Sequence, residues 1–217
     1  KETTPGFGGK LALQHRYSVI RLRAGCAFAA LLAGMLVEPP SGQGGLMALG
    51  IAMMVIDELS ALREQVSNDA LATRLSDFAS EFDVQPDCPA AELARAARTS
   101  LALDTLVDIH ALGALAYFYS GTGCPANEDT ITSIILGTSL LTRRGISTAG
   151  EYEVKNVLAM KIMDALGAGG SFTEYYAVDF NDDVVLMGHD GPGHSSIAEG
   201  KVNVKPLQVY HGKDVRG

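Results

Sequence analysis

The sequence has few of the features that mark a disulfide-rich, membrane-spanning or nucleic-acid-binding chain. Its three cysteines, Cys26, Cys88 and Cys124, are isolated and odd in number, and no two of them form a CxxC pair. We therefore expect no disulfide framework, but small buried thiols in a reducing cytoplasm. Lys and Arg number 17 against 25 Asp and Glu, which gives a net charge of −8. That balance argues against a nucleic-acid partner, because binding to phosphates needs a basic surface.

Long apolar runs are also lacking, which bears on membrane association. Residues 24–37 (AGCAFAALLAGMLV) end at a Glu-Pro-Pro sequence, and residues 46–56 (LMALGIAMMVI) form a shorter run. Both fall below the roughly 20 apolar residues that a membrane-spanning helix requires. Neither has the pattern of a signal peptide. We therefore predict core elements of a globular protein and no membrane partner. Because the chain begins at Lys1 rather than Met, we expect it to be a portion of a longer protein.

What the sequence does contain is an alternation of strand-like and helix-like segments. Hydrophobic residues make up 47% and charged residues 19%, which is enough apolar content for a substantial core. Short apolar runs predict strands that are buried on both faces, and apolar residues at helical spacing predict the helices between them. The alternation is typical of an α/β fold, with a mostly parallel sheet flanked by helices. The predicted elements are a helix at 24–36, a strand at 46–56, helices at 57–66, 71–82 and 89–113, a strand at 114–119 and a helix at 128–140.

The pattern changes beyond Gly170. Two strand-like segments, SFTEYYAVDF and DVVLMGHD, are joined by Asn181-Asp182, a pair typical of a β-hairpin turn. More extended sequence follows as far as Tyr210. We therefore predict an α/β domain over residues 1–145 and a β-rich catalytic segment over residues 146–217, which forms part of a larger domain.

Two carboxylates and two imidazoles stand out in this C-terminal part. Glu151 opens a helical pattern, Glu174 lies in a predicted aromatic strand, and His189 and His194 flank a Gly-Pro-Gly turn. An aromatic strand is a poor place for an unpaired charge, and carboxylates and neutral imidazoles are ligands that divalent ions such as Mn²⁺ accept. The pattern therefore predicts a metal-assisted reaction. Glu151 also suits a plain helix N-terminus, where Lys155 is placed to pair with it.

Other chemistries find little support in the sequence. Gly121-Thr122-Gly123 follows a predicted strand and precedes a helix, but it lacks the third glycine and the later acidic residue of a dinucleotide fingerprint. There is no GxSxG motif for a serine nucleophile, and Cys26 lies in an apolar run that disfavours a thiolate. An unrelated metal hydrolase stays open, because Glu/His sites also activate water.

The segments around these candidate ligands resemble a known family. AGEYEVKNVLAMKIMDALGAGGSFTEYY and LMGHDGPGH are similar to the catalytic segment of the L-arabinose isomerase and L-fucose isomerase superfamily, and more so to its arabinose-isomerase-like branch. The similarity is dense from Leu140 to Lys213 and looser through DELSALREQVSNDALATRLSDF and LAYFYSGTG. It implies reversible aldose–ketose isomerisation of a sugar such as L-arabinose or L-fucose, by proton transfer between C1 and C2 through an enediol. We expect a cytoplasmic homo-oligomer that acts on a small-molecule sugar.

The resemblance also implies roles for individual residues. Glu151, Glu174 and His189 would bind Mn²⁺, or Mg²⁺ or Co²⁺ in its place, the two glutamates would be the catalytic acid and base, and His194 would contact the substrate. The family has Gly-Asp after the first glutamate, where this chain has Tyr-Glu, and AFAALLAGMLVEPP stands in place of a family loop. A fourth ligand histidine and the N-terminal domain of the family are expected outside these 217 residues. These differences favour an alternative, a non-catalytic sugar-binding or assembly module of the same fold.

Overall fold

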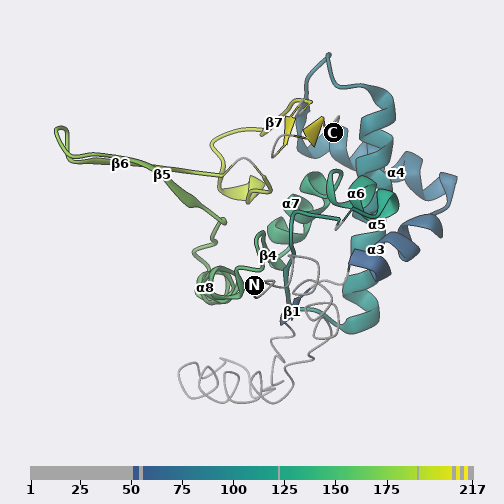
Figure 1. The fold of residues 1–217 in the computed structure, drawn as a ribbon, viewed down its shortest axis with the longest axis horizontal. Helices are drawn as coiled ribbons and strands as arrows, with labels where there is room; N and C mark the ends of the chain where they lie inside the picture. The colour runs from purple at the N-terminus through teal and green to yellow at the C-terminus, as the bar shows by residue number, and fades with distance from the viewer. Residues whose placement is uncertain are drawn as a thin grey trace, which may run out of the picture.

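The computed structural model describes residues 51–53, 56–121, 123–189, 191–206, 209–210 and 213–214. The predicted helix at 24–36, residues 46–50 of the first predicted strand, and Cys26 lie outside the described residues. Within them, the chain forms a mixed α/β structure (Figure 1). Its elements, in chain order, are β1 (Ile51–Met53), α3 (Ile56–Glu64), α4 (Asn68–Glu81), β2 (Asp83–Val84), α5 (Ala90–His110), β3 (Ala114–Ala116), α6 (Pro125–Ile131), α7 (Ile135–Arg143), β4 (Ser147–Ala149), α8 (Val154–Ala165), β5 (Glu174–Asp179), β6 (Val184–Gly188), the 3₁₀ turn η1 (Ser195–Ile197), β7 (Asn203–Val204), β8 (Val209–Tyr210) and β9 (Lys213–Asp214).

Three short strands form a parallel sheet in the order β1-β3-β4. Ala114 of β3 is aligned with Ile51 of β1 and with Ser147 of β4. Every residue of β3 is fully buried, as expected of a central strand that is covered on both faces. The prediction that the apolar runs 46–56 and 114–119 form neighbouring strands is therefore confirmed for residues 51–53 and 114–116.

Both strands are shorter than the apolar runs that predict them. The prediction is wrong at Ile56, which begins α3 instead of ending β1. Asp57 and Glu58 follow it in the first helical turn, where the positive end of the helix dipole stabilises carboxylates. Strand β3 likewise stops at Ala116, so that Tyr117 and the residues after it leave the sheet.

Side chains that alternate along β3 pack into two separate cores. Leu115 joins the larger core, to which α3, α5, α6 and α7 also contribute, with Leu103 of α5 fully buried in it. Ala114 and Ala116 join a smaller core together with Val157 of α8. Helices thus cover both faces of the short sheet, and Figure 1 shows α8 on one side of β4 and the remaining helices on the other.

Helix α4 occupies most of the predicted helix at 71–82, but it begins earlier, at Asn68. The Ser67 hydroxyl accepts a hydrogen bond from the Ala70 N–H (3.4 Å) and so caps the first turn. Phe78 and Phe82 lie edge to face, with ring centroids 6.0 Å apart, and form a third core with Ala97 of α5.

The single helix predicted over residues 128–140 is wrong, because α6 ends at Ile131 and α7 begins at Ile135. Thr132 and Ser133 lie in the break, and their hydroxyls donate to main-chain carbonyls four residues earlier, at 2.7 and 2.9 Å. Such bonds compete with the helical ladder. Cys124, at the N-cap of α6, is exposed, so the prediction of a buried thiol is wrong there.

Beyond α8, the described strands pair two by two. β5 and β6 form the predicted antiparallel hairpin, which projects from the body (Figure 1), and Asp179 accepts the Asn181 N–H (2.9 Å) in its turn. β2 pairs with β7, and β8 pairs with β9. β4 and α8 pack with β3, so the α/β layer continues beyond the predicted division at residues 145 and 146. None of the helices described here has the length and apolar character that crossing a membrane needs.

Candidate functional site

The carboxyl ends of β3 and β4 lie at the same edge of the parallel sheet, which is where α/β proteins bind their ligands. The Tyr117 N–H donates to the carbonyl of Ala149 (3.0 Å), and the Tyr152 N–H donates to the carbonyl of Tyr117 (2.9 Å). These bonds hold the two chain segments that leave the strands side by side. Glu151, a predicted ligand, lies in the second segment and is therefore positioned by the edge of the sheet.

Glu151 does not open a helix, contrary to the sequence-based expectation. Helix α8 begins at Val154, and Glu153 precedes it as the N-cap residue. Glu151 and Tyr152 have φ angles of 52° and 56°, in the left-handed region, and the bond from the Tyr152 N–H to Tyr117 ties this turn to the segment that follows β3. A left-handed conformation costs about 1–2 kcal/mol for each residue that carries a side chain. Two such residues in succession form a strained turn of the kind that concentrates at functional sites.

Aromatic rings occupy the space beside this turn. The Tyr152 ring stacks on Phe118 with centroids 5.4 Å apart and planes 19° apart. Phe118 also contacts the ring of Tyr119, at 4.5 Å. Burial raises the pKa of the Tyr152 phenol above its ordinary value, so the phenol is neutral at physiological pH. Glu151 is therefore flanked by a neutral aromatic surface.

Phe172 connects the turn after β4 with the turn after β6. Its ring is buried and meets the His189 ring edge to face, with centroids 4.5 Å apart and planes 73° apart. The Phe172 ring and the Tyr117 hydroxyl each lie 3.7 Å from the position that a Cβ atom on Gly150 would take. The Phe172 ring therefore contacts His189 and also lies beside Gly150, the residue before Glu151.

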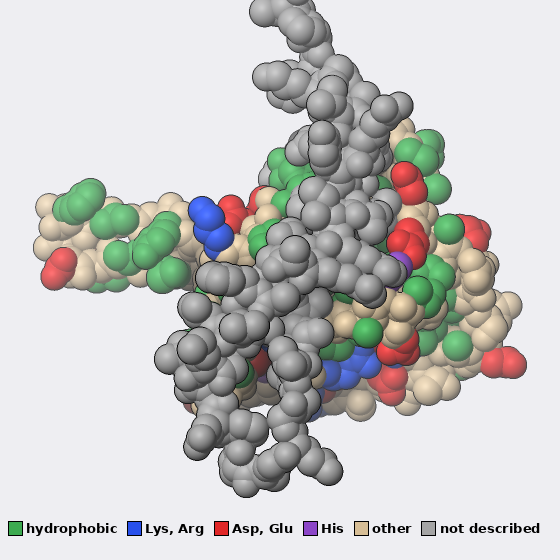
Figure 2. Space-filling model, turned by 90° about the horizontal axis from the view of Figure 1, so that it is seen from below, with side chains coloured by type: hydrophobic (Ala, Val, Ile, Leu, Met, Phe, Trp, Pro, Cys, Tyr) green, Lys and Arg blue, Asp and Glu red, His purple; other side chains and the backbone are tan. Residues whose placement is uncertain are grey.

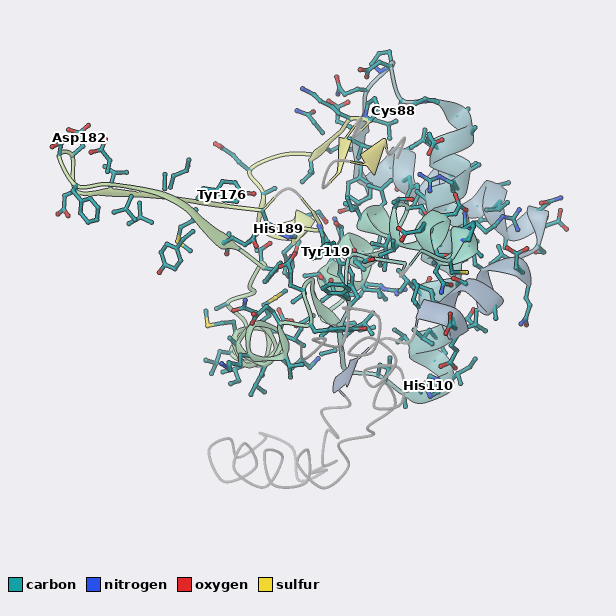
Figure 3. The ribbon with its side chains drawn as sticks, viewed as in Figure 1. Cys88, His110, Tyr119, Tyr176, Asp182 and His189 are labelled. Carbon is teal, nitrogen blue, oxygen red and sulfur yellow. The ribbon has the colours of Figure 1, made fainter. Side chains whose placement is uncertain are left out.

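Glu174 begins β5 at the base of the hairpin. It is paired with Gly188 of β6, the residue before His189. Its carboxylate is half-buried and makes no hydrogen bond or ion pair with another described residue. Glu151, Glu174 and His189 thus lie on three segments that meet around Phe172. Figure 3 shows His189 at the base of the hairpin, with Tyr119 nearby in the body.

The His189 imidazole is held through one of its nitrogens. Its Nδ1 accepts the Gly191 N–H (3.3 Å) and lies 3.4 Å from the carbonyl oxygen of Pro192. Its Nε2 has no hydrogen-bond partner among the described residues. Because Nδ1 accepts the Gly191 N–H, the proton of the neutral ring lies on Nε2. Nε2 presents a lone pair for a metal ion only in the other tautomer, in which the proton is on Nδ1 and donates to Pro192.

His194 lies on the other side of the Gly-Pro-Gly turn and is buried, with a hydrogen bond at Nδ1 and a carboxylate near Nε2. Its Nδ1 is 2.9 Å from the hydroxyl of Ser196, and its Nε2 is 3.8 Å from a carboxylate oxygen of Asp164. Asp164, near the end of α8, also accepts a hydrogen bond from Ser147 of β4 (2.8 Å). These contacts tie the segment after the hairpin to the α/β layer.

A cavity of about 500 Å³ opens between α5, α7 and the segment that follows the hairpin. That volume is within the range of small-molecule sites. His189 and His194 both line it, together with Ser139, Ser171 and Glu92 and a largely apolar remainder. The Ser139 hydroxyl accepts the Gly193 N–H (3.1 Å), so α7 fixes one wall of the cavity. His189 therefore borders both the Phe172 cluster and the cavity.

Cys88 lies in the wall of the same cavity. Burial, and then the charge of Asp87, raise the pKa of its thiol, and the thiol donates to the carbonyl of Val204 (3.1 Å). A neutral, hydrogen-bonded thiol is a structural group, not a nucleophile.

The segments that carry the predicted ligands meet, but the carboxylate oxygens and imidazole nitrogens on them do not form a metal-binding cluster. Among the residues that the structure describes, no three His, Cys, Asp or Glu side chains are placed to hold a metal ion. The metal set of Glu151, Glu174 and His189 stays a prediction. The chain matches no protein-family model, and no curated protein matches it significantly.

Sequence reasoning missed three residues that position this site. Phe172 bridges the two turns, Asp164 contacts His194, and Ser139 fixes the turn after the hairpin. The only signal for Phe172 is an aromatic side chain two residues before Glu174. Asp164 and Ser139 lie far from their partners in the sequence, and no local pattern singles them out.

Proposed function

We propose that this chain carries the catalytic segment of a metal-dependent aldose–ketose isomerase that acts on a small sugar. The observation that carries the proposal is the meeting of the segments of Glu151, Glu174 and His189 around Phe172, at the carboxyl edge of the sheet. The resemblance of these segments to the L-arabinose and L-fucose isomerase superfamily supplies the reaction. L-arabinose and L-fucose are the sugars that we propose as substrates.

The donor chemistry suits a divalent ion. Glu174 has no described partner, and His189 presents its Nε2 when Nδ1 donates to Pro192. Glu151, Glu174 and His189 would hold Mn²⁺, or Mg²⁺ or Co²⁺ in its place, and the ion would supply Lewis-acid polarisation of the sugar oxygens. The side chains must draw together from the arrangement described here when the ion binds.

The two carboxylates of this set are the groups that would move the proton. One takes the proton from C2 of the aldose and returns it to C1, while the other donates a proton to the oxygen at C1 and takes one from the oxygen at C2, so that an enediol forms and collapses to the ketose. General acid–base groups of this kind contribute about 10²- to 10⁴-fold to the rate. The aromatic rings of Phe172 and Tyr152 would exclude water from one side of the sugar.

Replacing Glu174 with Gln removes a proton acceptor and changes its volume little. We expect turnover of L-arabinose or L-fucose to fall by about 10²- to 10⁴-fold, while the thermal midpoint of unfolding changes little. Glu153→Gln is the matched control, because Glu153 is an exposed carboxylate two residues from Glu151 and lies outside the proposed set. Equal rates in the Glu174→Gln and wild-type proteins would contradict the catalytic assignment.

Metal content of the His189→Ala and His194→Ala variants distinguishes the roles of the two histidines. We expect His189→Ala to lose Mn²⁺ after dialysis and His194→Ala to keep it, because Ser196 engages Nδ1 of His194 and the buried Nε2 lies toward Asp164. Metal content by mass spectrometry checks this. Loss of metal only in the His194 variant would reverse the assignment.

A second candidate is a non-catalytic sugar-binding or assembly module. Tyr152, stacked on Phe118 directly beside Glu151, favours it, because a bulky ring fills space where the family has a glycine. Bound metal with no isomerisation of either sugar would select this candidate. Absence of both metal and turnover in Mn²⁺-supplied protein would reject the isomerase.

A further inference from the structure

The β5–β6 hairpin is an arm whose apolar side chains are unpacked. Four consecutive residues of β6 are 46–58% exposed, so both faces of this strand are open to solvent. Figure 2 shows hydrophobic side chains along the whole projecting arm. A two-stranded hairpin alone is marginally stable in water, which indicates that this arm is covered in the working protein. The four residues are Val184, Val185, Leu186 and Met187.

The outer edge of β6 is also unprotected. The sheet consists of β5 and β6 alone among the described residues, so the edge of β6 that faces away from β5 has no strand beside it. Proteins usually guard such an edge with a charge or a proline. Residues 184–188 (VVLMG) contain neither. The edge is therefore competent to pair with another strand.

The charged residues of the hairpin favour β6 over β5 as the strand that pairs with a second copy. If β5 paired with its own copy over its full length, Glu174 would lie opposite Asp179, and like charges in that position are destabilising. Pairing of β5 with the β6 of another molecule would not close and would lead to filaments. An antiparallel pair of two β6 strands brings no charges together within the strands, and it closes on a two-fold axis.

We propose that a second copy of this chain covers the arm, by antiparallel pairing of β6 with β6 across a two-fold axis at Leu186. Full overlap of residues 184–188 places Val184 opposite Gly188 of the second copy and Leu186 opposite itself. The same register brings Asp183, just before β6, opposite His189 of the second copy, just after it. Asp183 has a φ of 54° in the turn, so its side chain does not continue the pleat of β6, and the register places only the acidic tip of one arm near the base of the other.

This inference does not depend on the isomerase proposal, but it places the acidic tip of a second copy near a proposed metal ligand. Two acidic residues, Asp182 and Asp183, lie at the tip of the arm, as Figure 3 shows for Asp182. Dimerisation would therefore bring carboxylates near the site that a single copy does not provide there.

Sedimentation velocity on the full chain tests whether two copies associate through β6. We expect a dimer at micromolar concentration for the wild type. Leu186→Lys sets two ammonium groups opposite each other on the axis and should weaken the dimer by about tenfold or more. Val178→Lys is the matched control: Val178 is 48% exposed on the same hairpin, opposite Val185, but it lies on β5. A monomeric wild type, or equal weakening by both substitutions, overturns the proposal.

Cysteine cross-linking tests the register independently of association strength. Leu186→Cys should form a covalent dimer on mild oxidation, because directly opposed residues of antiparallel strands have Cα atoms about 4.5–5.5 Å apart, within disulfide reach. Val184→Cys alone should not cross-link, and a mixture of Val184→Cys and Gly188→Cys should. The wild type is the control for its own cysteines. Failure of Leu186→Cys to cross-link in a protein whose far-UV circular dichroism is unchanged overturns the two-fold register.

Discussion

At the scale of single residues, Gly191 decides where the His189 ring lies. A Cβ atom at position 191 would come within 2.5 Å of Cε1 of His189, so only glycine leaves room for the ring in this orientation. Displacement of the ring would also break its contacts with Pro192 and Phe172. Contacts that orient a ligand histidine typically contribute about 10- to 100-fold to metal affinity.

We therefore expect Gly191→Ala to weaken Mn²⁺ binding by about 10- to 100-fold without unfolding the protein. Isothermal titration calorimetry with Mn²⁺ measures this change. Gly200→Ala is the control, because a Cβ atom there meets nothing within 4 Å. Unchanged affinity in the Gly191 variant would show that the orientation of His189 does not matter for the metal.

At the residue scale, the sequence identified part of the candidate site. Residue type and spacing singled out Glu151, Glu174 and His189, and the structure places their segments around one ring. The backbone of Glu151 could not be predicted, because its left-handed turn is tied by a hydrogen bond from Tyr152 to Tyr117, a residue more than thirty positions earlier. Local patterns carry no information on such a bond.

At the scale of elements, Gly137 allows α7 to pack closely on α5. A Cβ atom at position 137 would lie 2.8 Å from the Ser100 Cα and from a methyl carbon of Leu103, and the backbone of α5 cannot easily move. We expect Gly137→Ala to lower the free energy of unfolding by about 1–3 kcal/mol. Urea unfolding should show a lower midpoint with an unchanged slope. Thr105→Ala, at an exposed position of α5, should be nearly neutral, and equal stability of the two variants would contradict the close packing.

Elements with a strong local signal were predicted well, and those set by tertiary contacts were not. The hairpin and the buried strand β3 follow from turn chemistry and apolar runs. The break between α6 and α7 does not. There, Thr132 accepts a hydrogen bond from Arg95 of α5 (2.8 Å) and Ser133 shares one with Thr99 (2.6 Å). The helical periodicity of one segment gives no information on hydrogen bonds to another helix.

At the scale of the whole molecule, two partly buried neutral acids, Tyr152 and Cys88, shape how stability depends on pH. Burial raises the pKa of Tyr152 above its ordinary value of 10.0, and burial with the nearby Asp87 raises that of Cys88 above 9.0. A group whose pKa is higher in the folded state binds its proton more tightly there. Its contribution to stability is therefore complete below the ordinary value and is lost as the pH rises through the raised one. Both groups therefore change the free energy of unfolding only at alkaline pH.

We expect the free energy of unfolding of the wild type to fall more steeply above pH 10 than that of Tyr152→Phe, because phenylalanine keeps the stack on Phe118 but has no proton to lose. Urea unfolding at about pH 8 and about pH 11 measures the difference in slope. Tyr175→Phe is the control: Tyr175 is 74% exposed, so the loss of its hydroxyl should leave the wild-type slope unchanged. Parallel pH dependences for the wild type and Tyr152→Phe would mean that the phenol reaches water as freely in the folded chain as in the unfolded one, and the turn beside Glu151 would then be open rather than enclosed by aromatic rings.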